Sequence, residues 1–168
     1  MKLEAIKQGV SSFLDSVAEG WRHLSESATN ALTRFSPGAG SSMPPPERVD
    51  DPFYRPSRSW SLLGGEVFED ANRIVVRLEV PGMDRQDMTV EVDDASLIIR
   101  GEKRFTAESA EGRWRIMQCA YGSFRRVVPL SVPVRADDAT ASYAKGVLRI
   151  ELPKAGPGVA PARTIRVE

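Results

Sequence analysis

The 168-residue sequence contains one cysteine, Cys119, and one histidine, His23. A single cysteine excludes an intramolecular disulfide framework and is typical of a reducing compartment. A single histidine, far from the strand-rich part of the chain, excludes a Ser-His-Asp triad there and any multi-histidine metal site. The chain also lacks a glycine-rich phosphate-binding loop. We therefore predict a protein that has no cofactor and is not an enzyme.

An excess of charge and long apolar runs are missing as well. The 23 Lys and Arg residues balance the 23 Asp and Glu residues, so nothing indicates a nucleic acid or an anionic membrane as partner. No run approaches the roughly 18 consecutive apolar residues of a membrane span. The first residues contain no signal-peptide core with a small-residue cleavage site. We expect a cytoplasmic protein.

The remaining candidates for chemistry have simpler interpretations. Cys119 has no histidine or second cysteine as partner, so we interpret it as a packed small side chain. The acidic pairs Asp93-Asp94 and Asp137-Asp138 fall where turns are expected. Arginines and aromatics between residues 113 and 126 could form a surface for single-stranded nucleic acid. The neutral net charge and the nearby acidic residues favour ion pairs within or between subunits instead.

Residues 1–36 carry apolar side chains in steps of three and four, which predicts an amphipathic helical arm. Gly9 and Gly20 weaken this helix by roughly 1 kcal/mol each relative to alanine, so a bend is expected. The apolar stripe has to be buried on the sheet, on a membrane surface, or against other protein chains. Because the polar face is mixed in charge, the membrane is disfavoured. We favour packing against copies of the chain or against another protein's apolar surface.

Residues 37–60 are rich in proline, glycine and serine, and we predict a linker there. The run Pro44–Pro46 stiffens its middle into an extended form. Phe53, Tyr54 and Trp60 are too many aromatic residues for a fully solvated linker, so part of it should dock. Recognition of the proline run by a partner domain is the alternative.

From residue 61 to residue 154, short runs alternate apolar and polar side chains, as strands with one buried face do. Residues 102–112 are polar and indicate a mobile loop, with a further strand at 113–118. About seven or eight short strands without a helical period predict an all-β fold, an antiparallel immunoglobulin-like β-sandwich.

The run 139–154 predicts a hairpin with a tight turn at Lys145-Gly146. Gly146 supplies the positive φ that such a turn requires, and Pro153 ends the pairing because it has no N–H. Residues 155–168 form a tail with a flexible spacer, and they include Ile165 and Val167, two apolar residues spaced by two. That spacing is typical of strand addition to a sheet edge. Burying each side chain contributes roughly 1.5–3 kcal/mol before the tail is ordered, so one such contact is reversible.

Several of these motifs, in this order, resemble the small heat-shock protein family, which is built on the α-crystallin domain. The resemblance covers roughly residues 66–168 and is similar to the bacterial and plant type. Its signature is the hairpin Ala141-x-Tyr143-x-x-Gly146-Val147-Leu148 followed by Leu152-Pro153-Lys154. The supporting motifs are Leu78-x-Val80-Pro81-Gly82, Leu97-x-Ile99-x-Gly101-Glu102-Lys103-Arg104 and Tyr121-Gly122-Ser123-Phe124-x-Arg126. Departures occur at Lys145, where the family often has Asn, and at Gln118-Cys119, where Glu-Arg is usual.

The resemblance implies an ATP-independent holdase chaperone, a stress-response protein assembled from dimers into a larger homo-oligomer. A strand with Trp114 and Ile116, in the loop of residues 102–118, would exchange into the partner's sandwich, and Arg126 would take part in ion pairing at the dimer. Ile165 and Val167 would anchor the oligomer in a neighbour's groove. That groove would be lined by Met88, Val90, Val92, Ala141 and Tyr143.

The resemblance also implies that partly unfolded client proteins bind the N-terminal arm. The expected client-binding residues are Phe13, Leu14, Val17, Trp21, Leu24 and Phe35. Two alternatives stay open. One is a non-enzymatic β-sandwich adaptor or co-chaperone, and the other is a stress protein that lies on membranes through its amphipathic helix.

Overall fold

The structure, a computed structural model, describes residues 31–38, 43–57, 59–93, 95–108, 111–156 and 163–167. Its strands are β1 (Leu32–Phe35), β2 (Ser59–Leu62), β3 (Gly65–Glu69), β4 (Arg73–Glu79), β5 (Met88–Asp93), β6 (Ser96–Lys103), β7 (Gly122–Pro129), β8 (Thr140–Ala144), β9 (Val147–Pro153) and β10 (Arg163–Ile165). Three 3-10 helices, Pro46–Arg48, Arg85–Asp87 and Ala136–Asp138, connect them. Most of the expected arm, with Phe13, Leu14, Val17, Trp21 and Leu24, lies outside the described residues.

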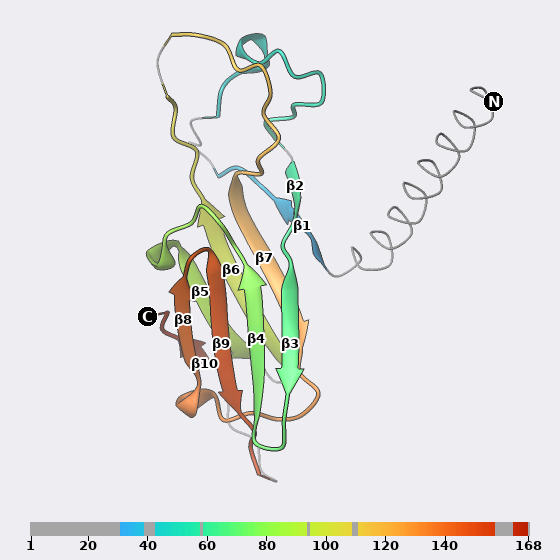
Figure 1. Cartoon of the computed structure of the whole chain (residues 1–168), viewed down its shortest axis with the longest axis vertical. Helices are drawn as coiled ribbons and strands as arrows, with labels where there is room; N and C mark the ends of the chain where they lie inside the picture. The colour runs from blue at the N-terminus through green and yellow to red at the C-terminus, as the bar shows by residue number, and fades with distance from the viewer. Residues whose placement is uncertain are drawn as a thin grey trace, which may run out of the picture. The chain divides into compact units, whose positions relative to one another are not determined.

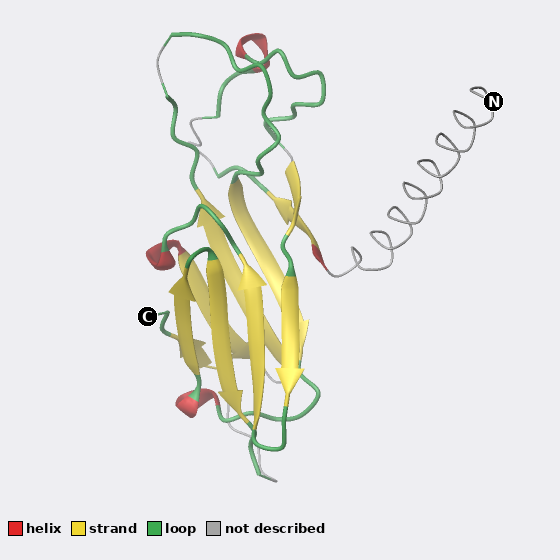
Figure 2. Cartoon of the chain, in the orientation of Figure 1, coloured by secondary structure: helices red, strands yellow, loops and turns green. Residues whose placement is uncertain are grey.

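Two four-stranded sheets make up the fold, in the orders β10-β5-β6-β7 and β3-β4-β9-β8, beside a two-stranded sheet of β1 and β2. Every pairing within the two larger sheets is antiparallel. Figures 1 and 2 show the two sheets facing each other, with long loops extending beyond the upper end of β6 and β7. The predicted antiparallel β-sandwich is confirmed.

The core lies between the two sheets because each strand alternates in polarity. In β4 and β9 every second residue faces inward, and in β5 and β6 the same alternation supplies the opposite wall. The most deeply buried residues from both walls include Ile74, Leu78, Val90, Leu97, Ile99, Leu148, Ile150 and Leu152. Each such side chain contributes roughly 1.5–3 kcal/mol to stability.

The β8–β9 hairpin turns at Lys145 and Gly146, as predicted. Lys145 has φ 53° and Gly146 has φ 80°, and both central residues of a type I′ turn need positive φ. A Cβ at Gly146 would lie 3.3 Å from the Cα of Pro81, and the Gly146 carbonyl accepts a hydrogen bond from Val80 N–H. The turn is therefore packed against the end of β4, which fixes the register of β8.

Residues 32–35 form a strand, not the end of a helix. Phe35 is only 2% exposed, and its ring lies 5.1 Å from that of Phe124 in β7. The following residue, Ser36, exchanges two backbone hydrogen bonds of 2.9 Å with Ser123. The prediction that the helical arm extends to residue 36 is wrong, because this segment pairs with the neighbouring β7 edge, and Phe35, predicted as a client-binding residue, lies in the sandwich core.

Candidate assembly surfaces

One candidate surface, which we call the groove, is the edge of the sandwich where the tail meets both β5 of one sheet and β8 of the other. Four of its five predicted lining residues, Met88, Val90, Val92 and Ala141, are buried with the tail in place, and the fifth, Tyr143, is partly buried. The Tyr143 hydroxyl donates a 3.0 Å hydrogen bond to the carbonyl of Val80. The fold thus brings together, from two sheets, the residues that the sequence assigned to one groove.

The tail of the same chain lies in this groove. Strand β10 pairs with β5 in the register Arg163↔Val92, Thr164↔Glu91 and Ile165↔Val90. Val167 then forms a parallel bridge with Ala141 of β8 and packs against the core. The tail therefore joins the two sheets at this edge. The sequence resemblance implied a neighbour's groove, and within one chain the nearest available tail is its own.

The opposite edge of the sandwich, at β3, is open. Within the described part of the chain, β3 pairs with β4 on one side only, and all five of its residues are exposed. Val67 is 56% exposed and Phe68 is 58% exposed. An unpaired, partly apolar edge strand is a ready template for pairing with another chain.

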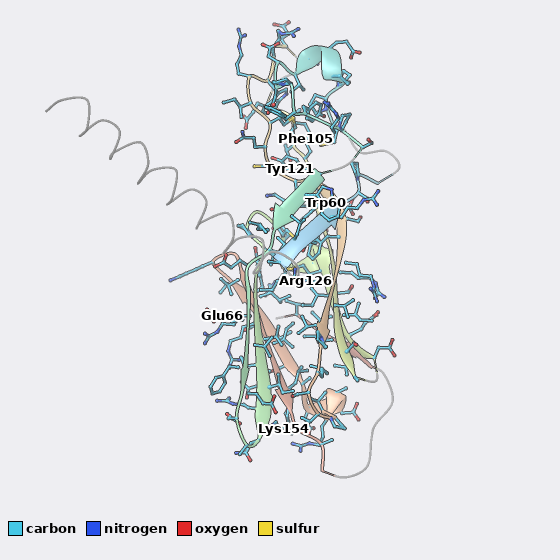
Figure 3. All side chains as sticks on the ribbon, turned by 90° about the vertical axis from the view of Figure 1, so that its right-hand side faces the viewer. Trp60, Glu66, Phe105, Tyr121, Arg126 and Lys154 are labelled. Atoms are coloured by element: carbon cyan, nitrogen blue, oxygen red, sulfur yellow. The ribbon has the colours of Figure 1, made fainter. Side chains whose placement is uncertain are left out.

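Arg126, predicted to form an ion pair between subunits, lies on β7 beside β1 (Figure 3). Its guanidinium donates a 3.1 Å hydrogen bond to the hydroxyl of Thr33, and no carboxylate among the described residues pairs with it. Partial burial lowers the pKa of Arg126, since desolvation disfavours the charged form.

Residues 43–57 and 111–121 form a second feature, which we call the loop lobe, at the top of Figure 1. The backbone N–H of Trp114 donates to the carbonyl of Arg48 at 2.9 Å, and the Trp114 carbonyl accepts from the backbone N–H of Asp50 at 2.8 Å. The two segments therefore make one parallel bridge. The strand predicted at 113–118 is reduced to this bridge at Trp114. Ile116, the other predicted exchange residue, is 68% exposed.

Aromatic stacking ties the loop lobe to the end of β6. The ring of Phe105 meets the ring of Tyr121 at 5.2 Å (Figure 3) and the ring of Trp114 at 5.4 Å, both edge to face. Tyr54 is buried in the other segment, and its hydroxyl donates 2.7 Å to the carbonyl of Pro44, whereas Phe53 is 86% exposed. These contacts give definite positions to residues that the sequence suggested were a linker and a mobile loop.

Ion pairs complete the loop lobe. Arg113 and Arg115 lie 2.5 Å and 2.7 Å from the carboxylate of Asp50, which confirms the predicted use of these arginines in ion pairs. The hydrogen bond from Arg113 holds the pKa of Asp50 below its usual value. Sequence reasoning missed Asp50, because its partners lie more than 60 positions away in the chain.

Cys119 is exposed, so its interpretation as a packed side chain is wrong. The next residue, Ala120, is the one that is buried at this point of the chain.

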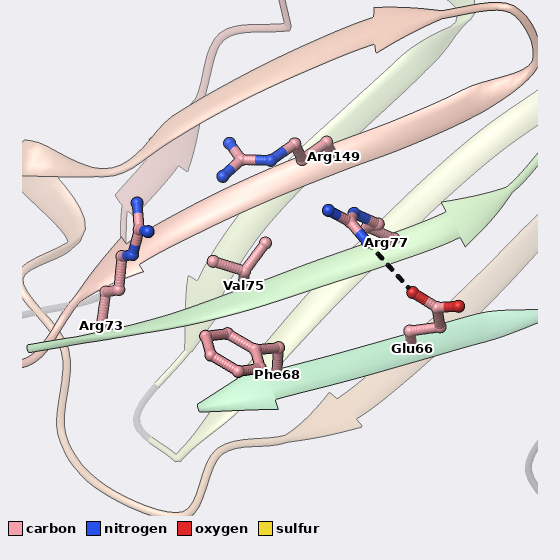
Figure 4. Close-up of a pocket in the computed structure, with 6 residues that line it drawn as sticks. All are labelled: Glu66, Phe68, Arg73, Val75, Arg77 and Arg149. Carbon is pink, nitrogen blue, oxygen red and sulfur yellow. Dashed lines mark hydrogen bonds and ion pairs between the residues drawn. The ribbon is translucent and has the colours of Figure 1, made fainter. Parts of the chain in front are cut away.

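The outer face of the β3-β4-β9-β8 sheet has a shallow hollow of about 350 Å³ lined by Glu66, Phe68, Arg73, Val75, Arg77 and Arg149 (Figure 4).

The hollow offers no catalytic arrangement. Arg77 pairs with Glu66 at 3.3 Å, and Arg73 and Arg149 both contact Glu151 at 2.7 Å. The hydrogen bond from Arg73, followed by that from Arg149, lowers the pKa of Glu151, which keeps this carboxylate ionised. In the residues the structure covers, no group of His, Cys, Asp and Glu could hold a metal ion, and no helix is long and apolar enough to cross a membrane.

The sequence matches a known protein family over most of its length. The profile of the Hsp20/alpha crystallin family matches residues 66–168. The chain is 33% identical over 135 residues to the mitochondrial 23.6 kDa heat shock protein of Oryza sativa, covering 80% of this chain and 56% of the relative. It is 33% identical over 91 residues to heat shock protein 16 of Schizosaccharomyces pombe, covering 53% of this chain and 64% of the relative. The chain thus spans little more than half the length of these relatives.

Solved structures agree with the fold. Heat shock protein 16.0 from Schizosaccharomyces pombe superposes with a TM-score of 0.52 at 30% identity, over 58% of this chain and 91% of that chain. A small heat-shock protein from Xylella fastidiosa superposes with a TM-score of 0.50 at 31% identity, over 64% of this chain and 97% of that chain. Its structure is described as revealing a distinct high order structure.

Proposed function

Because the chain belongs to the Hsp20/alpha crystallin family, we propose that it is an ATP-independent holdase chaperone. It binds partly unfolded proteins and prevents their aggregation under stress. The observation that carries this proposal is the β5/β8 groove with a tail strand in it, on a sandwich that matches the family over residues 66–168. A surface built to hold a short β-strand serves assembly and has no need of a nucleotide or a cofactor.

The proposed assembly unit is a dimer. No described strand pairs with the outer side of β3, and Ile116 in the loop lobe is an exposed apolar residue that could pack beside a partner's β3. Exchange of the segment around Trp114 and Ile116 between two chains would add a strand to each β3 edge. Arg126, which lacks a carboxylate partner among the described residues, would pair with an acidic residue of the other subunit.

Dimers join into a larger homo-oligomer through the tail in this proposal. A neighbour's tail would make the same backbone pairing with β5 that the chain's own tail makes, and would place Ile165 and Val167 at the same positions. The chain's own tail has the advantage of a short connection, which gives an effective concentration in the millimolar range. Exchange of tails between chains is therefore favoured only where several such contacts act together.

Client binding is assigned to the N-terminal arm, through the apolar stripe that includes Phe13, Leu14, Val17, Trp21 and Leu24. Phe35 is left out of this site because it belongs to the sandwich core. An apolar stripe suits partly unfolded proteins, since these expose apolar surface without a fixed shape. A cytoplasmic location is part of the proposal.

Light scattering of a heat-labile protein, heated with and without an equimolar amount of the chaperone, tests the activity. We expect the full chain to suppress aggregation without nucleotide, and a variant lacking residues 1–30 to lose most of this protection while its sandwich stays folded. The truncation stops before β1, so Phe35 remains in the core. Unchanged aggregation with the full chain would refute the holdase function, and full protection by the truncated chain would refute the arm as client site.

A second candidate, a small β-sandwich adaptor that recruits one partner, is favoured by the tail's position in its own groove. If that closure is permanent, the chain cannot anchor to neighbours. Native mass spectrometry distinguishes the two, because the adaptor predicts one or two subunits and the holdase predicts a larger assembly.

A further inference from the structure

We propose that Asp50 is a positioning residue for dimer formation, which holds residues 112–117 in the shape that a second copy of this chain receives on its β3 edge. The proposal rests on the dimer mode given above and adds a residue to it that no sequence motif includes. It concerns how the exchanged segment is prepared before it meets its partner.

The carboxylate of Asp50 contacts two arginines of the segment 112–117. Asp50 Oδ1 accepts from Arg113 Nε at 2.9 Å and Nη2 at 2.5 Å, and Oδ2 accepts from Arg115 Nη1 at 2.7 Å. Both oxygens are therefore used by two arginines that flank Trp114. Charge-assisted bonds with a forked guanidinium fix direction as well as distance. One aspartate thus holds both side chains on the same side of the exchanged segment.

The backbone makes the same connection. Trp114 uses its N–H and its carbonyl toward Arg48 and Asp50, and in an extended chain the groups of the next residues point the other way. Asp51 adds a contact further along, because its Oδ2 accepts from Met117 N–H at 3.1 Å. The segment is therefore held to residues 48–51 at both Trp114 and Met117, and Ile116 between them is 68% exposed.

The holding segment is itself fixed in place. Asp51 accepts from Phe53 N–H at 2.9 Å through its side chain and from Tyr54 N–H at 3.1 Å through its carbonyl. Tyr54 is buried, and Arg48 Nη2 donates to the carbonyl of Gly112 at 3.2 Å. The loop lobe is therefore a two-segment unit in which Asp50 makes the central contact.

Preorganisation explains why this contact would matter for dimerisation. A polar loop that is ordered only on binding loses conformational entropy at that moment, whereas a loop already held in shape has lost it before. Each exposed Arg–Asp pair contributes little to folding stability alone. The expected effect of Asp50 therefore lies on dimer affinity and on the order of residues 112–117, with little effect on the unfolding of the sandwich.

The test compares full-length Asp50→Asn with the parent chain, by measuring the dimer dissociation constant in a background where the tail residues Ile165 and Val167 are alanine. We expect the constant to rise by about tenfold or more, the size associated with loss of a charge-assisted network. Hydrogen exchange of residues 112–117 should become faster. Asp138→Asn, which removes an exposed aspartate paired with Arg135 at 2.6 Å, is the matched control and should change neither quantity.

A charge exchange gives the second measurement. Asp50→Arg combined with Arg113→Asp and Arg115→Asp should recover most of the affinity that Asp50→Arg alone loses. Unchanged affinity in Asp50→Asn would overturn the proposal, and tighter dimerisation would do so too, because the contact would then compete with exchange. Ile116→Asp distinguishes failure of the role of Asp50 from failure of the proposed dimer mode. If Ile116→Asp weakens the dimer while Asp50→Asn does not, only the role of Asp50 is refuted. If Ile116→Asp has no effect, the dimer mode itself fails.

Discussion

The two sheet edges of this sandwich differ in how they are completed. At the β5/β8 edge the chain's own tail pairs with β5 and bridges to β8, so apolar residues such as Val90 and Ala141 are buried. At the β3 edge no described segment pairs with the outer side, and Val67 and Phe68 remain largely exposed. The comparison indicates that one edge is completed by the chain's own tail, about 70 positions away in sequence, whereas the other edge has no complementary strand among the described residues.

Removal of the tail residues should have the largest effect. We expect Ile165→Ala with Val167→Ala to convert the assembly to dimers, because the apolar contribution that holds a tail in the groove is lost. Native mass spectrometry or sizing chromatography measures this, and circular dichroism should show a folded sandwich. Large oligomers of unchanged mass would mean that the closed edge has no part in assembly.

A charge at Ile116 should weaken the proposed dimer contact at the open β3 edge. We expect Ile116→Asp to raise the dimer dissociation constant by about ten- to a hundredfold, since roughly 1–3 kcal/mol is expected for an apolar contact replaced by a desolvated charge. Analytical ultracentrifugation at several concentrations gives the constant. Phe53→Asp is the control, because Phe53 is even more exposed and lies in the other segment of the loop lobe.

Acid should loosen the loop lobe before it affects the closed edge, whose contacts are apolar and backbone. The pKa of Asp50 is depressed in the folded chain, so its stabilising contribution is fully present above the ordinary aspartate value of about 3.9 and is lost as the pH falls through the lower folded value. Hydrogen exchange of residues 112–117 should therefore be constant from pH 7 down to about 4, after correction for the intrinsic rate, and should accelerate below it. Equal acceleration in β10 would contradict this order.

The smallest expected effect concerns the turn that sets the β8 wall of the closed edge. Lys145 has φ 53°, which asparagine tolerates better than lysine. Lys145→Asn should raise the free energy of unfolding by about 0.5–1 kcal/mol, without changing the groove. Denaturant unfolding measures the change, and Lys154→Asn, outside the turn, serves as a comparison that should not stabilise the fold. A destabilised Lys145→Asn would show that the lysine side chain makes a contribution greater than the backbone strain.

Most of the sandwich could be predicted from sequence because its signal is local. The alternation in residues 73–80 and 147–152 and the glycine at 146 depend on neighbours in the chain, and each prediction was confirmed in β4, β9 and the turn. Phe35 was misassigned for the opposite reason. Its spacing continues the helical stripe of the arm, and only the ring of Phe124, contributed by distant β7, explains why it is buried.

The sequence by itself determined the fold class and the β8–β9 hairpin, because period-two alternation and turn chemistry depend on residues within a few positions. Only the tertiary structure decided that the chain's own tail pairs with β5 and bridges to β8, that Phe35 belongs to the core, and that Asp50 meets Arg113 and Arg115. These are contacts between positions far apart in the chain. Charge and apolar character show that such residues need partners, and the packing of the sheets and loops selects which partners they meet.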